Sequence, residues 1–177
     1  MSNPVAGKYL LEILTSGMYS NPLHVYREYI QNASDSIDEA IRTNIISEDE
    51  ARIRINIDFD LRQIEIEDNG VGVHSNKART VLLSIGASAK DGLETRGFRG
   101  IGRLAGLAYA ETVVFETSSF GDKAKTILAC DCNKMKKLLQ RDNSEVSDVM
   151  EAFKAISTIT YVDEPRESHY FMVRLEG

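Results

Sequence analysis

The chain has 177 residues, of which 42% are hydrophobic and 27% are charged, a composition typical of a single globular domain with an apolar core. No apolar run approaches the roughly 20 residues that a membrane-spanning helix needs, and the N-terminus has no signal-peptide pattern. The formal net charge of −6 argues against a nucleic-acid surface, whose affinity depends on clustered positive charge.

The first quarter of the chain is predicted to be helical. Apolar residues at helical spacing indicate a helix from Val5 to Thr15. A second helix is predicted to begin with Asn21 as its N-cap and Pro22 at the first helical position, and to run to about Thr43. Apolar residues three and four positions apart form its expected buried stripe: Leu23, Tyr26, Ile30, Ala33, Ile37 and Ile41.

The rest of the chain is predicted to be rich in β-hairpins. Alternating apolar residues indicate a strand over 53–59, and a turn then leads to a second strand that begins at Ile64. Strands at 113–115 and 126–128 flank Gly121-Asp122 and indicate a second hairpin. The remaining expected elements are a helix over 76–84 capped by Ser75, a helix after Gly102, helices at 133–140 and 145–155, and strands at 158–162 and 170–175.

This order of elements predicts the fold class. Early helices and strands joined mainly by hairpins favour an α+β fold over a βαβ array. We expect a two-layer α/β sandwich with a mixed, mainly antiparallel sheet covered on one face by helices. Residues 1–177 are expected to form one domain, the N-terminal part of a longer protein. Cys130 and Cys132 are expected to be free thiols in the cytoplasm, because same-face cysteines two apart on a strand rarely form a disulfide.

One polar stripe on the long helix contains candidate ligands. At about 100° per residue, its four polar residues fall within roughly 60° of one another on the side opposite the predicted apolar stripe: Glu28, Asn32, Asp35 and Glu39. Such a stripe is often only a solvated face. A carboxylate followed one turn later by an amide also provides a base and an oxygen ligand for Mg²⁺, as a metal-bound phosphate chain requires.

Two glycine-rich segments follow. Asp68-Asn69-Gly70-Val71-Gly72 comes directly after a predicted strand, and glycines at alternate positions allow the backbone to approach a ligand closely. Gly97-Phe98-Arg99-Gly100-Ile101-Gly102 opens a predicted helix, where free amides favour a phosphate. Each segment is weak evidence alone, whereas the polar stripe and both segments together, in this order, are a strong signal for a nucleotide site.

These three motifs resemble those of the GHKL ATPase superfamily. YREYIQNASDSIDEA is similar to its N-box, IEDNGVG to its first glycine box and GFRGIG to its second. The likeness is greatest to the N-terminal domain of the ninety-kilodalton heat-shock chaperone, on Arg27-Glu28, the N-A-S-D run at 32–35 and the segment 84–90. The resemblance implies the Bergerat fold, binding of ATP or ADP with Mg²⁺, and ATPase activity.

The resemblance also implies roles for single residues. Glu28 would be the general base for the attacking water and Asn32 a ligand of Mg²⁺. Asp68 would accept a hydrogen bond from the adenine amino group. The adenine pocket would be lined by Gly72 and supported by Asp35, and Gly70 would be a further nucleotide-binding residue. The phosphates would be contacted by Lys90 and by the second glycine box: Gly97, Phe98, Arg99, Gly100, Ile101 and Gly102.

Some features depart from the family pattern or leave alternatives open. The Gly-Thr pair that many relatives carry on the last strand is replaced by Ser168-His169-Tyr170-Phe171, so Thr117 or Thr160 is a candidate for the second adenine contact. Arg103 is expected either to reach phosphate or to be a solvated charge, and the three histidines are expected on the surface or in loops.

The resemblance also implies a lid over roughly 74–99, a Lys or Arg from a following domain, and an ATP-dependent homodimer. A histidine-kinase-type phosphotransfer domain and a non-catalytic nucleotide-gated module remain alternatives, and chaperone, DNA-repair and topoisomerase roles are not separated.

Overall fold

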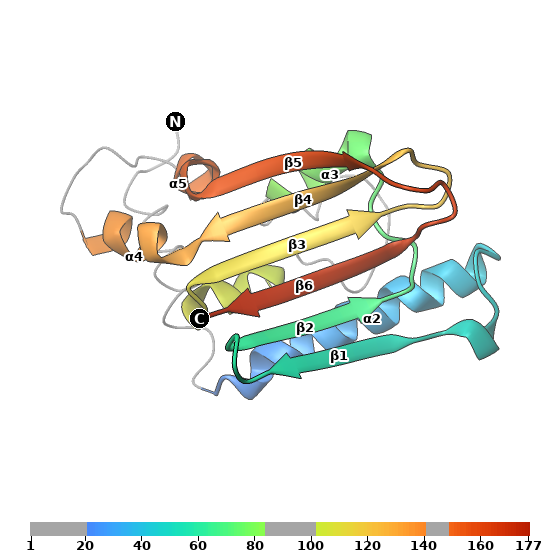
Figure 1. Ribbon diagram of the computed structural model, residues 1–177, viewed down its shortest axis with the longest axis horizontal. Coiled ribbons are helices and arrows are strands. Elements are labelled where there is room, and N and C mark those ends of the chain that lie inside the picture. Colours follow the sequence, from blue (N-terminus) through green and yellow to red (C-terminus); the bar gives the residue numbers. More distant parts are fainter. Residues whose placement is uncertain (1–20, 84–101, 141–148) are drawn as a thin grey trace.

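The computed structural model describes residues 21–83, 102–140 and 149–177. Its six strands form one sheet in the order β1-β2-β6-β3-β4-β5 (Figure 1). The strands are β1 (Ile53–Asp58), β2 (Gln63–Asp68), β3 (Thr112–Ser118), β4 (Ala124–Asp131), β5 (Ser157–Asp163) and β6 (Tyr170–Glu176). The helices are α2 (Leu23–Arg42), α3 (Ser75–Leu83), α4 (Cys132–Gln140) and α5 (Val149–Ile156), with 3-10 turns η2 (Glu48–Glu50) and η3 (Gly102–Ala108).

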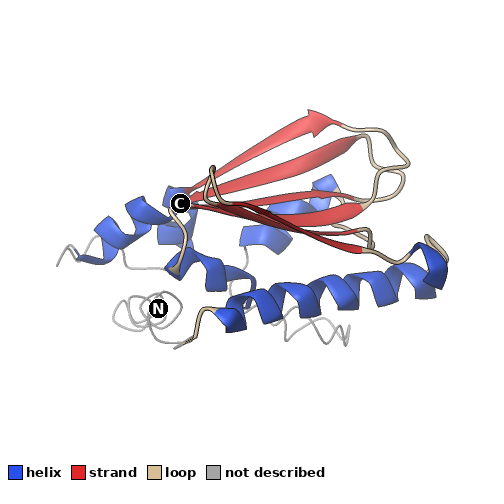
Figure 2. Cartoon of the chain, turned by 60° about the horizontal axis from the view of Figure 1, so that its bottom comes forward, coloured by secondary structure: helices blue, strands red, loops and turns tan. Residues whose placement is uncertain are grey.

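The sheet and the helices form two layers. Figure 2 shows the helices gathered on one face of the sheet, which confirms the predicted α+β sandwich. The core between the layers contains Phe115 and Leu128 from the sheet and Phe153 from α5, all fully buried. The expectation of a mixed sheet is wrong for the part of the chain that the structure describes, because all five strand pairings there are antiparallel.

The last strand occupies the middle of the sheet. β6 pairs with β2 on one side and with β3 on the other, although these strands are far apart in the sequence. Its register places Phe171 opposite Asp68 and Val173 opposite Ile66. The inward-facing residues of β6 therefore lie beside the end of β2, from which the first glycine-rich segment leaves.

The buried face of α2 differs from the face that the sequence predicts. Its buried residues are Val25, Tyr29, Ala33, Ile37 and Ala40. Leu23 and Ile30, which the predicted stripe includes, are 67% and 38% exposed. At 100° per residue the buried line is displaced by roughly 70° from the predicted stripe, toward the polar residues. The polar stripe consequently borders the core, and its members are half-buried.

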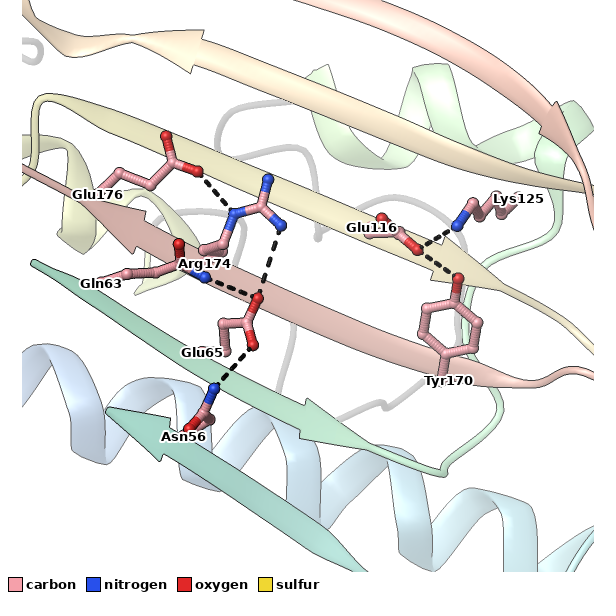
Figure 3. Close-up of polar contacts among 8 residues, drawn as sticks. All are labelled: Asn56, Gln63, Glu65, Glu116, Lys125, Tyr170, Arg174 and Glu176. Atoms are coloured by element: carbon pink, nitrogen blue, oxygen red, sulfur yellow. Dashed lines mark hydrogen bonds and ion pairs between the residues drawn. The ribbon is translucent and has the colours of Figure 1, made fainter. Parts of the chain in front are cut away.

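The outer face of the sheet has no helix packed on it among the described elements, and it carries a network of polar side chains (Figure 3). Glu116 accepts a hydrogen bond from the Tyr170 hydroxyl at 2.6 Å and pairs with Lys125 at 2.7 Å. Arg174 pairs with Glu65 at 3.6 Å and with Glu176 at 2.7 Å. These pairs satisfy neighbouring charges across four strands and identify this face as the polar side of the sandwich.

The remaining sequence-based expectations are largely met within the described ranges. Both predicted hairpins form, and Cys130 and Cys132 are free and buried. The expectation that both cysteines lie on one strand is wrong, because β4 ends at Asp131 and Cys132 begins α4. The Ser75 hydroxyl does not cap its own helix; it donates instead to Asp122 at 3.1 Å, and the Asp122 carboxylate accepts from the Ser75 N–H at 2.6 Å. The predicted helix over residues 5–15 lies outside the described residues. None of the helices described is both long enough and apolar enough to cross a bilayer.

Candidate functional site

A pocket opens between α2 and the inner face of β2 and β6. Its apolar walls come from both layers: Tyr29, Ala33, Ile66, Val71, Val73, Phe171 and Val173. Its polar and charged lining residues are Asn32, Asp35, Ser36, Glu39, Asp68 and Arg103, and Gly72 completes the lining. A concave, mostly apolar cavity with a few convergent polar groups is the usual form of a small-molecule site.

The polar stripe of α2 supplies one rim of the pocket. Asn32, Asp35, Ser36 and Glu39 follow one another at helical spacing, so they face the same side. The Gln31 side chain donates to Asp35 at 3.0 Å. Because the buried face of α2 lies closer to the polar stripe than predicted, these residues line the pocket. The interpretation of the stripe as a solvated face therefore does not hold.

Asp68 is the most buried carboxylate of the pocket. It is the last residue of β2 and is 4% exposed, and its Oδ1 accepts a hydrogen bond from the Gly70 N–H at 2.9 Å. Burial raises the pKa of the Asp68 carboxyl to about 7, while hydrogen bonds from Gly70 and the Ser36 side chain act in the opposite direction. A buried acceptor with a perturbed pKa in a concave pocket is a strong candidate for a ligand-binding group.

The first glycine segment is packed tightly between α2 and the sheet. A Cβ at Gly70 would overlap the Ser36 hydroxyl, and the Val71 N–H donates to the Ser36 carbonyl at 3.3 Å. Gly72 has φ +60°, a conformation that favours glycine, and a Cβ there would overlap the Ser118 carbonyl oxygen. The glycines therefore let the loop lie against α2 and leave Gly72 at the pocket wall.

His169 holds the same loop from the other side. Its Nδ1 lies 3.1 Å from the Asn69 carbonyl oxygen and 3.0 Å from that of Gly70, so it acts as a donor to both. His169 lies in the loop between β5 and β6, as expected for the histidines, but it is half-buried and bonded to the glycine loop, which the sequence did not indicate. Its position in the stretch that replaces the family's Gly-Thr pair gives it a direct contact with this loop.

Neither threonine considered for the second adenine contact lines the pocket. The Thr117 hydroxyl accepts from the Val73 N–H at 2.8 Å and donates to the Tyr170 carbonyl at 2.9 Å. Thr160 lies exposed on β5. The side chains of β6 that do line the pocket are Phe171 and Val173, which are apolar.

Glu28 lies one turn before Asn32, at the edge of the pocket, and is half-buried. It faces the start of η3, because a Cβ at Gly102 would overlap the Glu28 Oε2. The end of the second glycine box therefore contacts the candidate base directly. Arg103, the next residue, is 5% exposed, so it is not the solvated charge that was one of its two expected states.

The structure thus brings most of the predicted residues to one place. Asn32, Asp35, Asp68 and Gly72 line the pocket, whereas Glu28, Gly70 and Gly102 lie next to it. The other predicted ligand-binding residues lie outside the described residues: Lys90, Gly97, Phe98, Arg99, Gly100 and Ile101. Sequence reasoning missed Ser36, although it follows Asn32 by one helical turn, and it missed Tyr29 and His169, for which no local signal existed.

The part of the chain that the structure describes offers few clustered side-chain ligands for a metal ion. Within the described ranges, no three His, Cys, Asp or Glu residues lie close enough together to form a metal cage. The Asn32 amide is an oxygen donor at the pocket rim, with Asp35 beside it. Mg²⁺ commonly takes one or two protein oxygens and completes its shell with phosphates and water, and this donor set fits that pattern.

The chain matches known proteins over most of its length. A family model described as "Histidine kinase-, DNA gyrase B-, and HSP90-like ATPase" matches residues 19–160. The chaperone protein HtpG of Psychrobacter arcticus is 33% identical over 134 residues, which cover 66% of this chain and 20% of that protein. HtpG of Burkholderia lata is 31% identical over 139 residues, and HtpG of Paraburkholderia xenovorans is 31% identical over 142 residues; each match covers 68% of this chain and 22% of the relative. The chain spans about a fifth of the length of these curated relatives. The match to the family model confirms the resemblance to this ATPase family that the motifs indicate.

Proposed function

Because the chain belongs to the histidine kinase-, DNA gyrase B- and HSP90-like ATPase family, we propose that it binds ATP or ADP with Mg²⁺ between α2 and β6 and hydrolyses ATP slowly. The observation that carries this proposal is the position of Asp68, a carboxylate 4% exposed in the lining of a mostly apolar pocket. Burying a carboxylate is costly, and its burial becomes favourable when a ligand donates a hydrogen bond to it.

The adenine ring is assigned to the inner part of the pocket. Its faces would pack on Val71, Val73 and Phe171, whose side chains line the cavity. Its 6-amino group would donate to the Asp68 carboxyl, which Gly70 and Ser36 hold in place. This arrangement supports selection of adenine when the Asp68 carboxyl is ionised, because a purine with a carbonyl oxygen at position 6 would then place an acceptor against an acceptor.

The phosphates are assigned to the rim formed by α2 and the start of η3. Asn32 would supply an oxygen to Mg²⁺, and the ion would neutralise phosphate charge during hydrolysis. Glu28 would orient a water molecule and accept its proton, since its carboxylate lies at Gly102, where the second glycine box ends. The amides of that box would contact the phosphates, as helix N-termini and glycine-rich loops commonly do.

The wider biological setting is also a proposal. The relatives that match are named chaperone proteins, and we infer a chaperone-like ATPase in the cytoplasm. A following domain would supply a Lys or Arg to the γ-phosphate, and ATP would favour a homodimer. Glu28 distinguishes this proposal from a phosphotransfer domain of the histidine-kinase type, because a base placed for water suits hydrolysis.

A direct binding measurement tests the proposal. Titration of the 177-residue chain with ADP and Mg²⁺ in a calorimeter should give saturable 1:1 binding. Because the ligand binds only the folded state, saturation at 100 times its dissociation constant should also raise the free energy of unfolding by ~2.7 kcal/mol. Absence of both heat and stabilisation would contradict nucleotide binding. Binding without any phosphate release from ATP would instead support the non-catalytic, nucleotide-gated alternative.

A further inference from the structure

The Tyr29 hydroxyl joins α2 to η3 through two hydrogen bonds. It donates to the Arg103 carbonyl at 2.9 Å and accepts from the Gly106 N–H at 3.0 Å. The Tyr29 side chain is 4% exposed, and the Arg103 and Gly106 residues are also buried. Hydrogen bonds in such a dry environment are costly to lose unless the partners left behind can bond to each other, because no water replaces the lost group.

The two groups that the Tyr29 hydroxyl bonds, the Arg103 carbonyl and the Gly106 N–H, belong to the same 3-10 turn. In a 3-10 turn, the carbonyl of residue i accepts from the N–H of residue i+3, and Arg103 and Gly106 are such a pair. The phenol therefore bonds to both halves of one turn of η3, whose seven residues exceed the three or four that are usual for this helix type. A side chain inserted at such a pair fixes the local path of the backbone.

Gly106 makes this contact possible. A Cβ at that position would lie 2.5 Å from the Tyr29 hydroxyl oxygen and 2.6 Å from the Leu175 Cδ2. Any larger residue would have to displace both the Tyr29 phenol and the side chain of Leu175, which lies on β6. The Tyr29 and Gly106 positions are thus mutually dependent.

The contact lies directly beside the proposed catalytic group. Tyr29 is the neighbour of Glu28 in α2, and Gly102, against which the Glu28 carboxylate lies, begins the same η3 turn. Two adjacent residues of one helix therefore contact η3, Glu28 at its first residue and Tyr29 at its second and fifth. Any movement of η3 along α2 would change the distance between Glu28 and the amide of Gly102.

We propose that Tyr29 is a positioning residue for ATP hydrolysis: its hydroxyl fixes η3 on α2 and so holds the end of the second glycine box at the Glu28 carboxylate. The proposal rests on the proposed ATPase function. Tyr29 would contribute to the hydrolysis step and little to nucleotide affinity, because its ring at the pocket wall is retained when only the hydroxyl is removed.

The test is Tyr29→Phe, which keeps the ring and removes the hydroxyl. The Arg103 carbonyl and the Gly106 N–H can then bond directly to each other, so η3 shifts while the fold persists. We expect the single-turnover rate of ATP hydrolysis to fall at least about tenfold, since a displacement of ~1 Å can cost up to about 10²-fold, with the dissociation constant of ADP changing less than about twofold. Tyr26→Phe, on the same helix and packed against the core outside the pocket, is the matched control and should leave both values unchanged.

A second measurement does not depend on hydrolysis. Amide hydrogen exchange at Gly106 should be slow in the empty wild-type chain, where the Gly106 N–H donates to the Tyr29 hydroxyl, and faster in Tyr29→Phe. In a double-mutant cycle, Gly106→Ala should destabilise the wild type more than it destabilises Tyr29→Phe, because the Cβ meets the hydroxyl only in the former. Equal hydrolysis rates in Tyr29→Phe and the wild type would overturn the proposal, as would additive free energies in the cycle. A wild-type chain that binds no ADP would instead overturn the proposed nucleotide site, while Gly106 exchange would still decide whether Tyr29 fixes η3.

Discussion

Asp122 and Ser75 are 47 positions apart in the sequence, and the Asp122 carboxylate nevertheless accepts a hydrogen bond from the Ser75 N–H at 2.6 Å. Ser75 is the first residue of α3, so the β3–β4 hairpin provides the N-terminal cap of this helix. The Ser75 hydroxyl and the Lys123 N–H donate to the same carboxylate. The start of α3, which leads toward the second glycine box, is therefore fixed to the sheet.

Asp122→Ala should destabilise the chain by about 1 kcal/mol, the usual cost of a lost helix cap. The effect should be strongest in α3, where amide exchange over residues 75–83 should accelerate. Burial acts to raise the pKa of Asp122, but the hydrogen bonds from Ser75 and Lys123 outweigh it and lower the pKa. The stabilisation is therefore present above the unfolded-state pKa and is lost as the pH falls through the lower, folded-state value.

Asp60→Ala is the control for this experiment, because Asp60 is an exposed aspartate in the β1–β2 turn. Urea denaturation of both variants at neutral pH provides the comparison. Equal stabilities of Asp122→Ala and Asp60→Ala would show that the contact between the hairpin and α3 contributes nothing.

The pH dependence of stability should report on Asp68. Its folded-state pKa of about 7 lies above the ordinary 3.8, so between these values the folded protein holds a proton that the unfolded chain releases. The free energy of unfolding of the empty chain should therefore fall as the pH rises from about 4 to about 7, and Asp68→Asn should remove this component. The component is at most about 4 kcal/mol, since one pKa unit corresponds to ~1.36 kcal/mol. Urea denaturation of the wild type and of Asp68→Asn between pH 4 and 7 measures this component. If the free energies of unfolding of the two proteins changed in parallel with pH, the result would contradict a raised pKa of Asp68.

Glu28 and Asn32 should separate hydrolysis from binding. Glu28→Ala should lower the rate of ATP hydrolysis by roughly 10²–10⁴-fold and change ADP affinity only a few-fold, because a general base acts on water and not on the bound phosphates. Asn32→Ala should instead lose the Mg²⁺-dependent part of the affinity. Calorimetry with and without Mg²⁺, together with a phosphate-release assay, distinguishes the two. Loss of Mg²⁺-dependent affinity in Glu28→Ala would show that the roles are assigned wrongly.

His169 should support nucleotide binding through the glycine loop. His169→Phe keeps an aromatic ring and removes the donor to the Asn69 and Gly70 carbonyls, which lie next to Asp68. At about 1 kcal/mol per net hydrogen bond, ADP affinity should fall by roughly fivefold. His24→Phe, at the exposed start of α2, is the control and should bind ADP like the wild type. Unchanged affinity in His169→Phe would show that the loop keeps its position without this histidine.

Local patterns predicted the elements of this fold well. The alternation of apolar residues after Ile53 and the turn chemistry before Ile64 are properties of neighbouring residues, and the hairpin that they predict is present. The candidate site was also partly predictable, because Asn32 and Asp35 belong to one helical stripe and Asp68 ends a strand before a glycine loop. In both cases the information lies within a few residues of sequence.

Features that depend on tertiary packing were not predictable. The face that α2 buries is set by its contacts with β2 and η3. The exposure of Ile30 therefore could not be predicted from the spacing of apolar residues in the helix. The contact of His169 with Gly70 joins residues 99 positions apart, and that of Tyr29 with Gly106 joins residues 77 apart. Such contacts have no signature in a single local segment.

The central claim is that the Asp68 carboxyl receives the 6-amino group of adenine, and one comparison tests it most directly. Calorimetric titration with Mg²⁺ should be performed with ADP and with inosine diphosphate, which has a carbonyl oxygen in place of the 6-amino group. At a pH of about 8.5, where a carboxyl with a pKa of about 7 is ionised, the wild type should bind ADP at least about tenfold more tightly, since losing a hydrogen bond to a charged group costs about 1.5–3 kcal/mol. Asp68→Asn should bind ADP weakly and lose most of this preference, because its amide can donate to the inosine carbonyl. Equal affinities of the wild-type chain for the two nucleotides, or an unchanged preference in Asp68→Asn, would contradict the claim.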